Sequence, residues 1–145
     1  MLREATINDA DTLAGLMGEL GYPTTYPEMR QRLLTILPDP SYKTLVYDNC
    51  GKIIAMIGMV LNYAYELNES YVRVVALVVS SEHRNRGIGS ALLFEAEKWA
   101  KERGASVLVL NSGNRDERSF AHQFYINRGF QGKSTGFIKF LDWLD

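Results

Sequence analysis

The sequence predicts an α/β domain built on a mixed β-sheet, and two features of the chain lead to this fold class. Strand-like apolar segments form a meander through the middle of the chain, and a strand–helix–strand–helix–strand series follows it. The length of 145 residues suits one sizeable core, and no linker, repeat or low-complexity run divides it. We therefore expect one domain over residues 1–145, with a central sheet flanked by about four helices.

The N-terminal segment predicts a short strand and then a helix. The strand is Leu2–Thr6, and Asn8 and Asp9 supply capping groups for the helix. Its apolar residues recur at the spacing of one buried helix face, at Leu13, Leu16, Met17 and Leu20. Gly21–Pro23 ends this helix, because glycine and proline cannot continue it easily.

A second helix and a β-hairpin come next. The helix begins near Pro27 and stops before Pro38. Its buried face is predicted to hold Met29, Leu33 and Leu37. Lys43–Tyr47 and Lys52–Asn62 then form a hairpin around the turn at Asn49–Gly51.

The middle of the chain predicts a strand–helix–strand unit. Tyr71–Val79 is almost continuously apolar, which favours a central strand covered on both faces. A helix from about Gly87 to Arg103 follows and ends at Gly104. Val107–Leu110 is short and entirely apolar, so we expect a buried strand parallel to its predecessor.

The C-terminal segment predicts a last helix and a final strand. Asn114 and Glu117 make a box-like cap for the helix, which ends at Gly129. The tail Gly132–Leu144 alternates enough to form the strand. An exposed strand edge over Ser134–Leu141 invites pairing with a second copy, which predicts a homodimer.

Composition excludes several classes of function. The net charge is −1, so no general attraction to nucleic acid or anionic membranes is expected. The longest apolar stretches, Ile53–Leu61 and Val74–Val79, are too short to span a bilayer, and Met1–Glu4 opens no signal peptide. Cys50 has no disulfide partner, and no His, Cys or carboxylate spacing suggests a metal site. A cytoplasmic protein is expected.

One segment predicts a phosphate site between a strand and a helix. After the apolar strand comes a basic turn with Arg84 and Arg86, then Gly87 and Gly89 where the helix begins. Glycines let backbone N–H groups approach an anion, and the helix start adds unpaired donors and a positive dipole end. The dinucleotide fingerprint needs a further glycine where Leu92 stands, and no Gly-Lys-Ser/Thr of a P-loop follows.

Two signatures together resemble the GNAT family of N-acetyltransferases. Arg84-x-x-Gly87-x-Gly89 is similar to the family's coenzyme A pyrophosphate loop. Arg118–Phe130 resembles its second signature, an Ala-x-x-x-Tyr-x-x-x-Gly-Phe helix end, with arginine where many members have asparagine. The resemblance covers about residues 71–140 closely, and it implies a GNAT-like fold.

The resemblance also implies acetyl-CoA as cofactor. Its pantetheine arm would enter a slot where a bulged strand parts from its neighbour, and a bulge N–H near Leu77 would polarise the acetyl carbonyl. Arg84, Arg86 and Arg118 are candidates for the 3′-phosphate. The full set of implied cofactor contacts is Leu77, Val78, Val79, Arg84, Asn85, Arg86, Gly87, Ile88, Gly89, Ser90, Asn111, Arg118, Ala121 and Phe124.

Tyr125 is the candidate catalytic acid. Phenols titrate near pH 10, so a phenol is protonated at neutral pH and can give its proton to a thiolate. The alternative is a tyrosine that only packs. The family's strand glutamate, a general base in some members, is replaced by Arg73. Arginine cannot serve as that base. Glu66, Glu69 and Glu82 could act through water, but a solvated turn residue is the simpler explanation of each, so the base stays unassigned.

Acceptor recognition is expected in the segments least like the family. Tyrosines and carboxylates suit a cationic amine. Arg73 is a candidate to grip a substrate carboxylate, or else pairs with Glu66. The candidate acceptor residues are Tyr22, Tyr26, Tyr63, Tyr65, Glu66 and Arg73.

Together these features predict an N-acetyltransferase that moves an acetyl group directly from acetyl-CoA to a primary amine of a small molecule or peptide. One alternative is acylation of a protein lysine or N-terminus. Another is a non-catalytic module that binds acyl-CoA as a sensor.

Overall fold

The computed structural model describes residues 1–111, 119–133 and 136–142. They fall into two compact units, Met1–Leu110 and Asn111–Asp145. The first unit holds a sheet and three helices, and the second holds helix α4 (Ser119–Asn127). The elements of the first unit are β1 (Leu2–Glu4), α1 (Ala10–Leu20), α2 (Tyr26–Ile36), β2 (Tyr42–Asn49), β3 (Lys52–Asn62), β4 (Tyr71–Val79), α3 (Ile88–Glu102) and β5 (Val107–Leu110).

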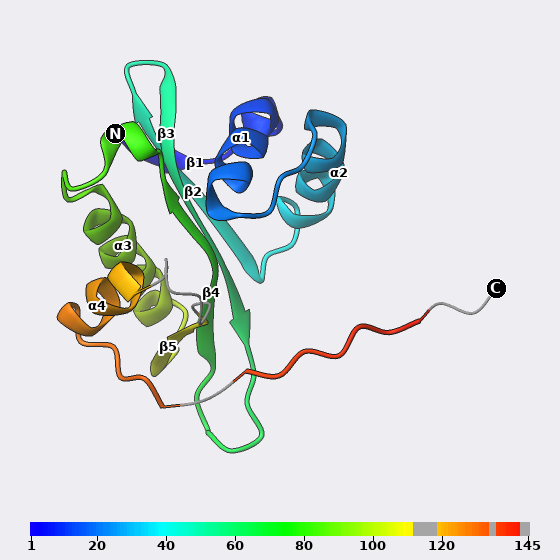
Figure 1. The fold of residues 1–145 in the computed structure, drawn as a ribbon. Helices are drawn as coiled ribbons and strands as arrows, with labels where there is room; N and C mark the ends of the chain where they lie inside the picture. The colour runs from blue at the N-terminus through cyan, green and yellow to red at the C-terminus, as the bar shows by residue number, and fades with distance from the viewer. Residues whose placement is uncertain (112–118, 134–135, 143–145) are drawn as a thin grey trace. The chain divides into compact units, whose positions relative to one another are not determined.

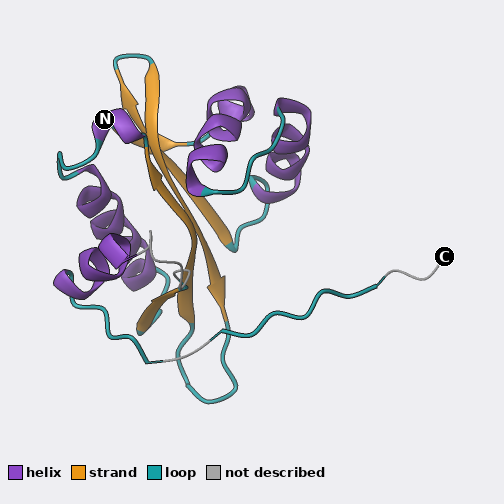
Figure 2. Cartoon of the chain, in the orientation of Figure 1, coloured by secondary structure: helices purple, strands orange, loops and turns teal. Residues whose placement is uncertain are grey.

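The sheet has the order β1-β2-β3-β4-β5, which is the order of the chain (Figure 1). The pairs from β1 to β4 are antiparallel, and β4 and β5 are parallel. Helix α3 connects the two parallel strands. Helices α1 and α2 lie on one face of this sheet and α3 lies on the other (Figure 2). The predicted mixed sheet with four helices is therefore confirmed.

The core between the sheet and the first two helices joins side chains from most elements of the unit. Leu13 and Leu33 come from the helices, and Val46, Met56 and Val78 come from successive strands. All five are 5% exposed or less, so each contributes about 1.5–3 kcal/mol of hydrophobic free energy relative to an exposed side chain. This core fixes α1 against β4.

Both N-terminal helices begin at capping boxes. Thr6 and Asp9 cap a short 3₁₀ helix, Ile7–Asp9, which leads directly into α1. Thr25 and Glu28 cap α2 in the same reciprocal way. Each box satisfies N–H groups that a helix start leaves unpaired.

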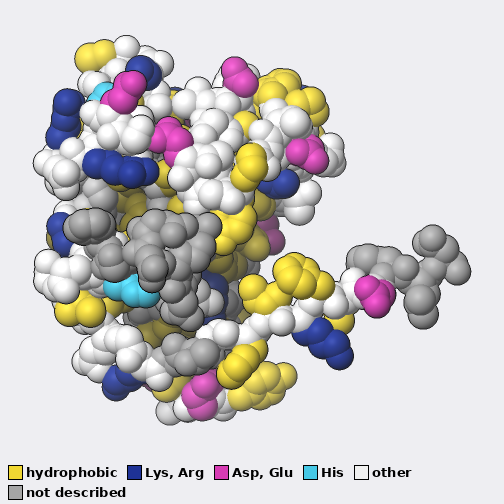
Figure 3. Space-filling model, viewed as in Figure 1, with side chains coloured by type: hydrophobic (Ala, Val, Ile, Leu, Met, Phe, Trp, Pro, Cys, Tyr) yellow, Lys and Arg dark blue, Asp and Glu magenta, His cyan; other side chains and the backbone are white. Residues whose placement is uncertain are grey.

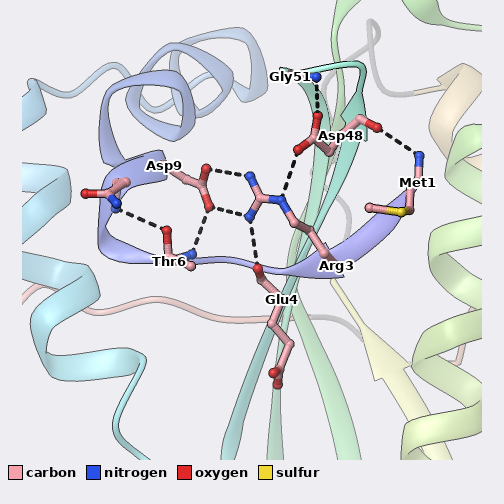
Figure 4. Close-up of polar contacts among 8 residues, drawn as sticks. Met1, Arg3, Glu4, Thr6, Asp9, Asp48 and Gly51 are labelled. Carbon is pink, nitrogen blue, oxygen red and sulfur yellow. Dashed lines mark hydrogen bonds and ion pairs between the residues drawn. The ribbon is translucent and has the colours of Figure 1, made fainter.

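An ion-pair network ties β1 to the start of α1 (Figure 4). Arg3 donates to both carboxylate oxygens of Asp9 at 2.9 Å and to Asp48 Oδ2 at 3.0 Å. Asp9 is 7% exposed and also accepts the Thr6 N–H at 2.8 Å. The Arg3 guanidinium holds the pKa of Asp9 below its usual range, chiefly through these hydrogen bonds.

Three strand predictions need correction. Strand β5 is only partly buried, with Val107 41% exposed, because no further described strand pairs with it. Strand β4 alternates between buried and half-exposed positions rather than being covered throughout. In the tail, the described residues 132–133 and 136–142 form no strand, because they have no ladder partner to satisfy their backbone groups.

Candidate active site

The candidate site begins at a β-bulge in β4. Opposite β3, Gly58 pairs with Ala76 and Met59 pairs with Val74, so Val75 is the extra residue. Val75 is 51% exposed, unlike its buried neighbour Val74. The bulge expected near Leu77 therefore lies two residues earlier. An apolar run gives no sign of which residue is left unpaired.

Strands β4 and β5 part at the same point. Their parallel ladder runs from Tyr71 opposite Val107 to Val74 opposite Leu110, where β5 ends. Beyond it, Val75–Val79 has no strand partner on the β5 side among the described residues. Half of the backbone N–H and C=O groups of a strand face each side, so this edge can hydrogen-bond an extended ligand.

The loop from Ser80 to Gly87 continues from the open edge. Asn85 has φ +63° and Gly87 has φ +77°, both in the left-handed region, and Gly87 is the N-cap of α3. A Cβ placed on Gly87 would meet nothing within 4 Å, so this side of the loop is open. Backbone turns of this type point N–H groups into an anion-binding concavity, which the positive end of α3 reinforces.

Polar contacts hold the loop in place. Arg84 Nε donates to the Val79 carbonyl oxygen at 3.2 Å, which ties the loop to the end of β4. The Ser81 N–H donates to Glu19 Oε1 of α1 at 2.8 Å. Sequence reasoning missed Glu19, and no local signal would reveal a contact between residues 62 positions apart.

The loop is positively charged. It carries Arg84 and Arg86, both exposed, and basic side chains gather over it at the upper left of Figure 3. His83 Nδ1 is buried without a hydrogen-bond partner among the described residues. Of the other predicted cofactor contacts in this unit, Ile88 is buried at the first turn of α3 and Gly89 and Ser90 are half-buried there.

The candidate acid lies in the second unit. Tyr125 on α4 is half-buried and packs edge-on against Phe124 and Phe130, with ring centroids 5.4 and 5.8 Å away. Arg128 lies over the Phe124 ring at 3.6 Å. Ala121 shares this helix and is half-buried, while Asn111 is exposed. Arg118 and the proposed cap at Asn114 and Glu117 fall outside the described residues.

The predicted acceptor residues do not form one group. Tyr22 follows α1, whose Glu19 reaches Ser81 just beyond the end of β4. Tyr63 and Tyr65 lie in the connection that precedes β4 and are 86% and 108% exposed. The nine residues of β4 separate the two places by roughly 25 Å.

The remaining acceptor and base candidates are spread in the same way. Tyr26 is the first residue of α2 and is 47% exposed. Glu66 and Glu69 are exposed before β4, and Glu82 is exposed in the loop after it. Arg73 alone lies close to the bulge, two residues before Val75 on β4.

Searches of the described residues for two other kinds of feature returned nothing. Within residues 1–111, 119–133 and 136–142, no three His, Cys, Asp or Glu side chains gather to hold a metal ion. In the same part of the chain, no helix has the length and hydropathy needed to cross a membrane.

Comparisons with known proteins agree with this geometry. The sequence model of the Acetyltransferase (GNAT) family matches residues 12–130. The aminoalkylphosphonate N-acetyltransferase of Salmonella typhimurium is 29% identical over 141 residues, which cover 97% of this chain and 90% of that protein. An uncharacterised N-acetyltransferase of Bacillus subtilis is 30% identical over 86% of each chain.

Solved structures show the same fold. A GNAT family acetyltransferase from Staphylococcus aureus superposes with a TM-score of 0.82 at 32% identity, covering 97% of this chain and 98% of that one. A glucosamine-6-phosphate N-acetyltransferase from Arabidopsis thaliana has a TM-score of 0.81 at 21% identity, a level that supports the fold alone.

Proposed function

The chain belongs to the GNAT family of acetyltransferases, and on this premise we propose that it transfers an acetyl group from acetyl-CoA directly to the primary amine of a small molecule. The observation that carries the proposal is the open edge of β4 over Val75–Val79, continuous with the basic loop that ends at Gly87. Acetyl-CoA would need both features side by side, the strand edge for its extended pantetheine arm and the basic loop for its pyrophosphate.

The residues of this loop fit the phosphate end of acetyl-CoA. Asn85 and Gly87 have left-handed φ values, the space beside Gly87 is open, and Arg86 adds positive charge between them. The backbone of Leu77, Val78 and Val79, on the open edge of β4, would pair with the pantetheine arm. Acetyl-CoA, when bound, supplies an acetyl group as a reactive thioester.

Backbone and side-chain groups of this chain then assist the transfer. A backbone N–H at or after the bulge would hydrogen-bond the acetyl oxygen as it gains negative charge. The Tyr125 phenol would give its proton to the departing thiolate. Its place on α4 in the second signature supports this assignment.

A small molecule is the proposed acceptor. The Salmonella relative that matches nearly the whole chain is named for aminoalkylphosphonates, which are small amines. That name supports a compact acceptor for this chain over a protein lysine or N-terminus. The acceptor must lose its ammonium proton to a base or to water before attack, because an alkylammonium titrates near pH 10.4 and has no free lone pair on nitrogen.

The test combines binding with turnover. Calorimetric titration should show that the protein binds acetyl-CoA, and release of free thiol in the presence of small primary amines should show transfer. Tyr125→Phe should lower kcat at least 100-fold and leave acetyl-CoA affinity unchanged. Tyr47→Phe is the matched control, because Tyr47 is a half-buried residue of β2. This variant should keep wild-type turnover.

Two results would contradict the proposal. Failure of the wild-type protein to bind acetyl-CoA would exclude the transferase function. Normal turnover by Tyr125→Phe would exclude Tyr125 as the acid. Binding without transfer to any amine would favour the acyl-CoA sensor instead.

A further inference from the structure

Arg73 lies on the same sheet face as the core beneath α1. Arg73 pairs with Val60 of β3, and Val78 pairs with Met56. Val60 and Met56 are four residues apart in one strand, so their side chains share a face. Met56 and Val78 belong to the core that α1 and α2 cover. Arg73 therefore lies on that face, nearer the start of β4 than the part that packs against α1.

Its direct partners on the neighbouring strands carry no charge. Val60 and Val109 flank it on the neighbouring strands, and its side chain is half-buried. The Arg73 side chain makes no hydrogen bond or ion pair with any residue that the structure describes. The predicted pairing with Glu66 is therefore not formed.

A second arginine of the same sheet shows what a satisfied guanidinium looks like. Arg3 uses three nitrogens to bind Asp9, Asp48 and the Glu4 carbonyl oxygen. Partial burial of a charge without a partner costs free energy, because water is removed and nothing replaces it. No described residue occupies the five side-chain N–H donors of Arg73, which could bind an anion that approaches this face.

The distance to the bulge matches a compact acceptor. Two strand residues, about 7 Å, separate Arg73 from Val75. Val75 is half exposed, so a small molecule can reach this part of the strand. An amine joined to an acidic group by two or three carbons would span about 5–6 Å between the two charges, which fits this spacing to order of magnitude.

We propose that Arg73 binds an anionic group, a carboxylate or a phosphonate, on the amine acceptor, and so selects small amines that also carry an acid. Arginine suits this task because its planar fork forms two parallel hydrogen bonds to such groups. The inference rests on the proposed function, since it names the acceptor class of the same site.

Steady-state kinetics with matched acceptors test it. β-Alanine and 2-aminoethylphosphonate carry the acid, and propylamine is an amine of similar length that lacks it. The readout is the ratio of kcat/KM for each acidic amine to that for propylamine, at saturating acetyl-CoA. The wild-type ratio should exceed 10 for one or both acids, and the larger ratio identifies carboxylate or phosphonate.

Three variants separate recognition from general effects. Arg73→Gln should lower the ratio at least tenfold, mainly by raising KM for the acidic amine. Arg73→Lys keeps the positive charge but loses the planar guanidinium. Its ratio should therefore fall between those of the wild type and Arg73→Gln. Arg30→Gln makes the same charge change on an exposed position of α2 and should keep the wild-type ratio.

The outcomes distinguish this inference from the proposed function. Wild-type protein that acetylates propylamine as efficiently as both acids overturns the inference alone, and so does an unchanged ratio in Arg73→Gln. Wild-type protein that does not bind acetyl-CoA overturns the proposed function, and the inference with it. Calorimetric titration of Arg73→Gln with acetyl-CoA should give wild-type affinity, which shows that the variant is folded.

Discussion

Alanine at Gly87 tests whether the loop before α3 binds acetyl-CoA. Gly87 has φ +77°, and a Cβ there meets nothing within 4 Å. Gly104, just past the other end of α3, has φ +78° and is equally open. The two glycines therefore share nearly the same φ and lie at opposite ends of a 15-residue helix, about 22 Å long.

The matched conformations predict matched costs in stability. An L-residue in the left-handed region costs about 1–2 kcal/mol, and the lower entropy of the unfolded alanine chain offsets about 0.4–1 kcal/mol of it. We expect Gly87→Ala and Gly104→Ala each to lose about 1 kcal/mol of unfolding free energy. For a chain of this size that is about 3 °C in Tm.

Binding should separate the two variants. The Cβ of Gly87→Ala points into the open space where the phosphates would lie, so acetyl-CoA affinity should fall at least tenfold, or about 1.4 kcal/mol. Gly104→Ala should bind like wild type. Calorimetric titration gives the affinities and thermal unfolding gives the Tm values. Equal affinities of the two variants would refute the assignment of this loop.

Three further predictions concern stability and the loop. Asp9→Asn should cost about 2–3 kcal/mol in urea unfolding, because it breaks the paired contact of a buried carboxylate with Arg3. The pKa of Asp9 is lower in the folded protein than in the unfolded chain. Its contribution to stability is therefore complete above the unfolded pKa near 4, and it is lost as the pH falls through the lowered folded pKa. Asp9→Asn should therefore lose less stability on acidification than wild type. Leu33→Ala, at a position 1% exposed, should cost about 3 kcal/mol, whereas Leu34→Ala, 45% exposed, should change unfolding free energy by under about 0.5 kcal/mol. Glu19→Ala removes the acceptor for the Ser81 N–H and should weaken acetyl-CoA binding about fivefold by calorimetry; unchanged affinity would show that this contact does not position the loop.

Local signals predicted most element boundaries. The apolar runs Tyr71–Val79 and Val107–Leu110 are the observed strands β4 and β5, because a polar residue ends each run. Helix α2 begins one residue before the predicted Pro27, and its cap comes from Thr25. Gly87 and Gly104 flank α3 because both positions have a left-handed φ, which glycine adopts most easily.

Features that depend on distant partners were not predictable in this way. The contact between Glu19 and Ser81 exists only because the core places α1 against the end of β4. The separation of Tyr22 from Tyr63 also follows from the sheet, since both are tyrosines in polar loops and differ only in which end of β4 they approach. Alternation in the tail predicted a strand, but a strand also needs a neighbour.

The position of the bulge explains why the site opens where it does. At Val75 the ladder to β3 gains a residue, and at Val74 the ladder to β5 ends. A bulge bends its strand and increases the local twist, so β4 turns away from a straight parallel neighbour at that point. Leu110 is also the last residue of β5, so no described strand pairs with this edge of β4 beyond the bend. The opening is therefore a property of backbone register. The bulge at Val75 depends on pairing with β3, so the Val75 side chain gives no local sign of it, and the same register places Arg73 on the face that α1 covers.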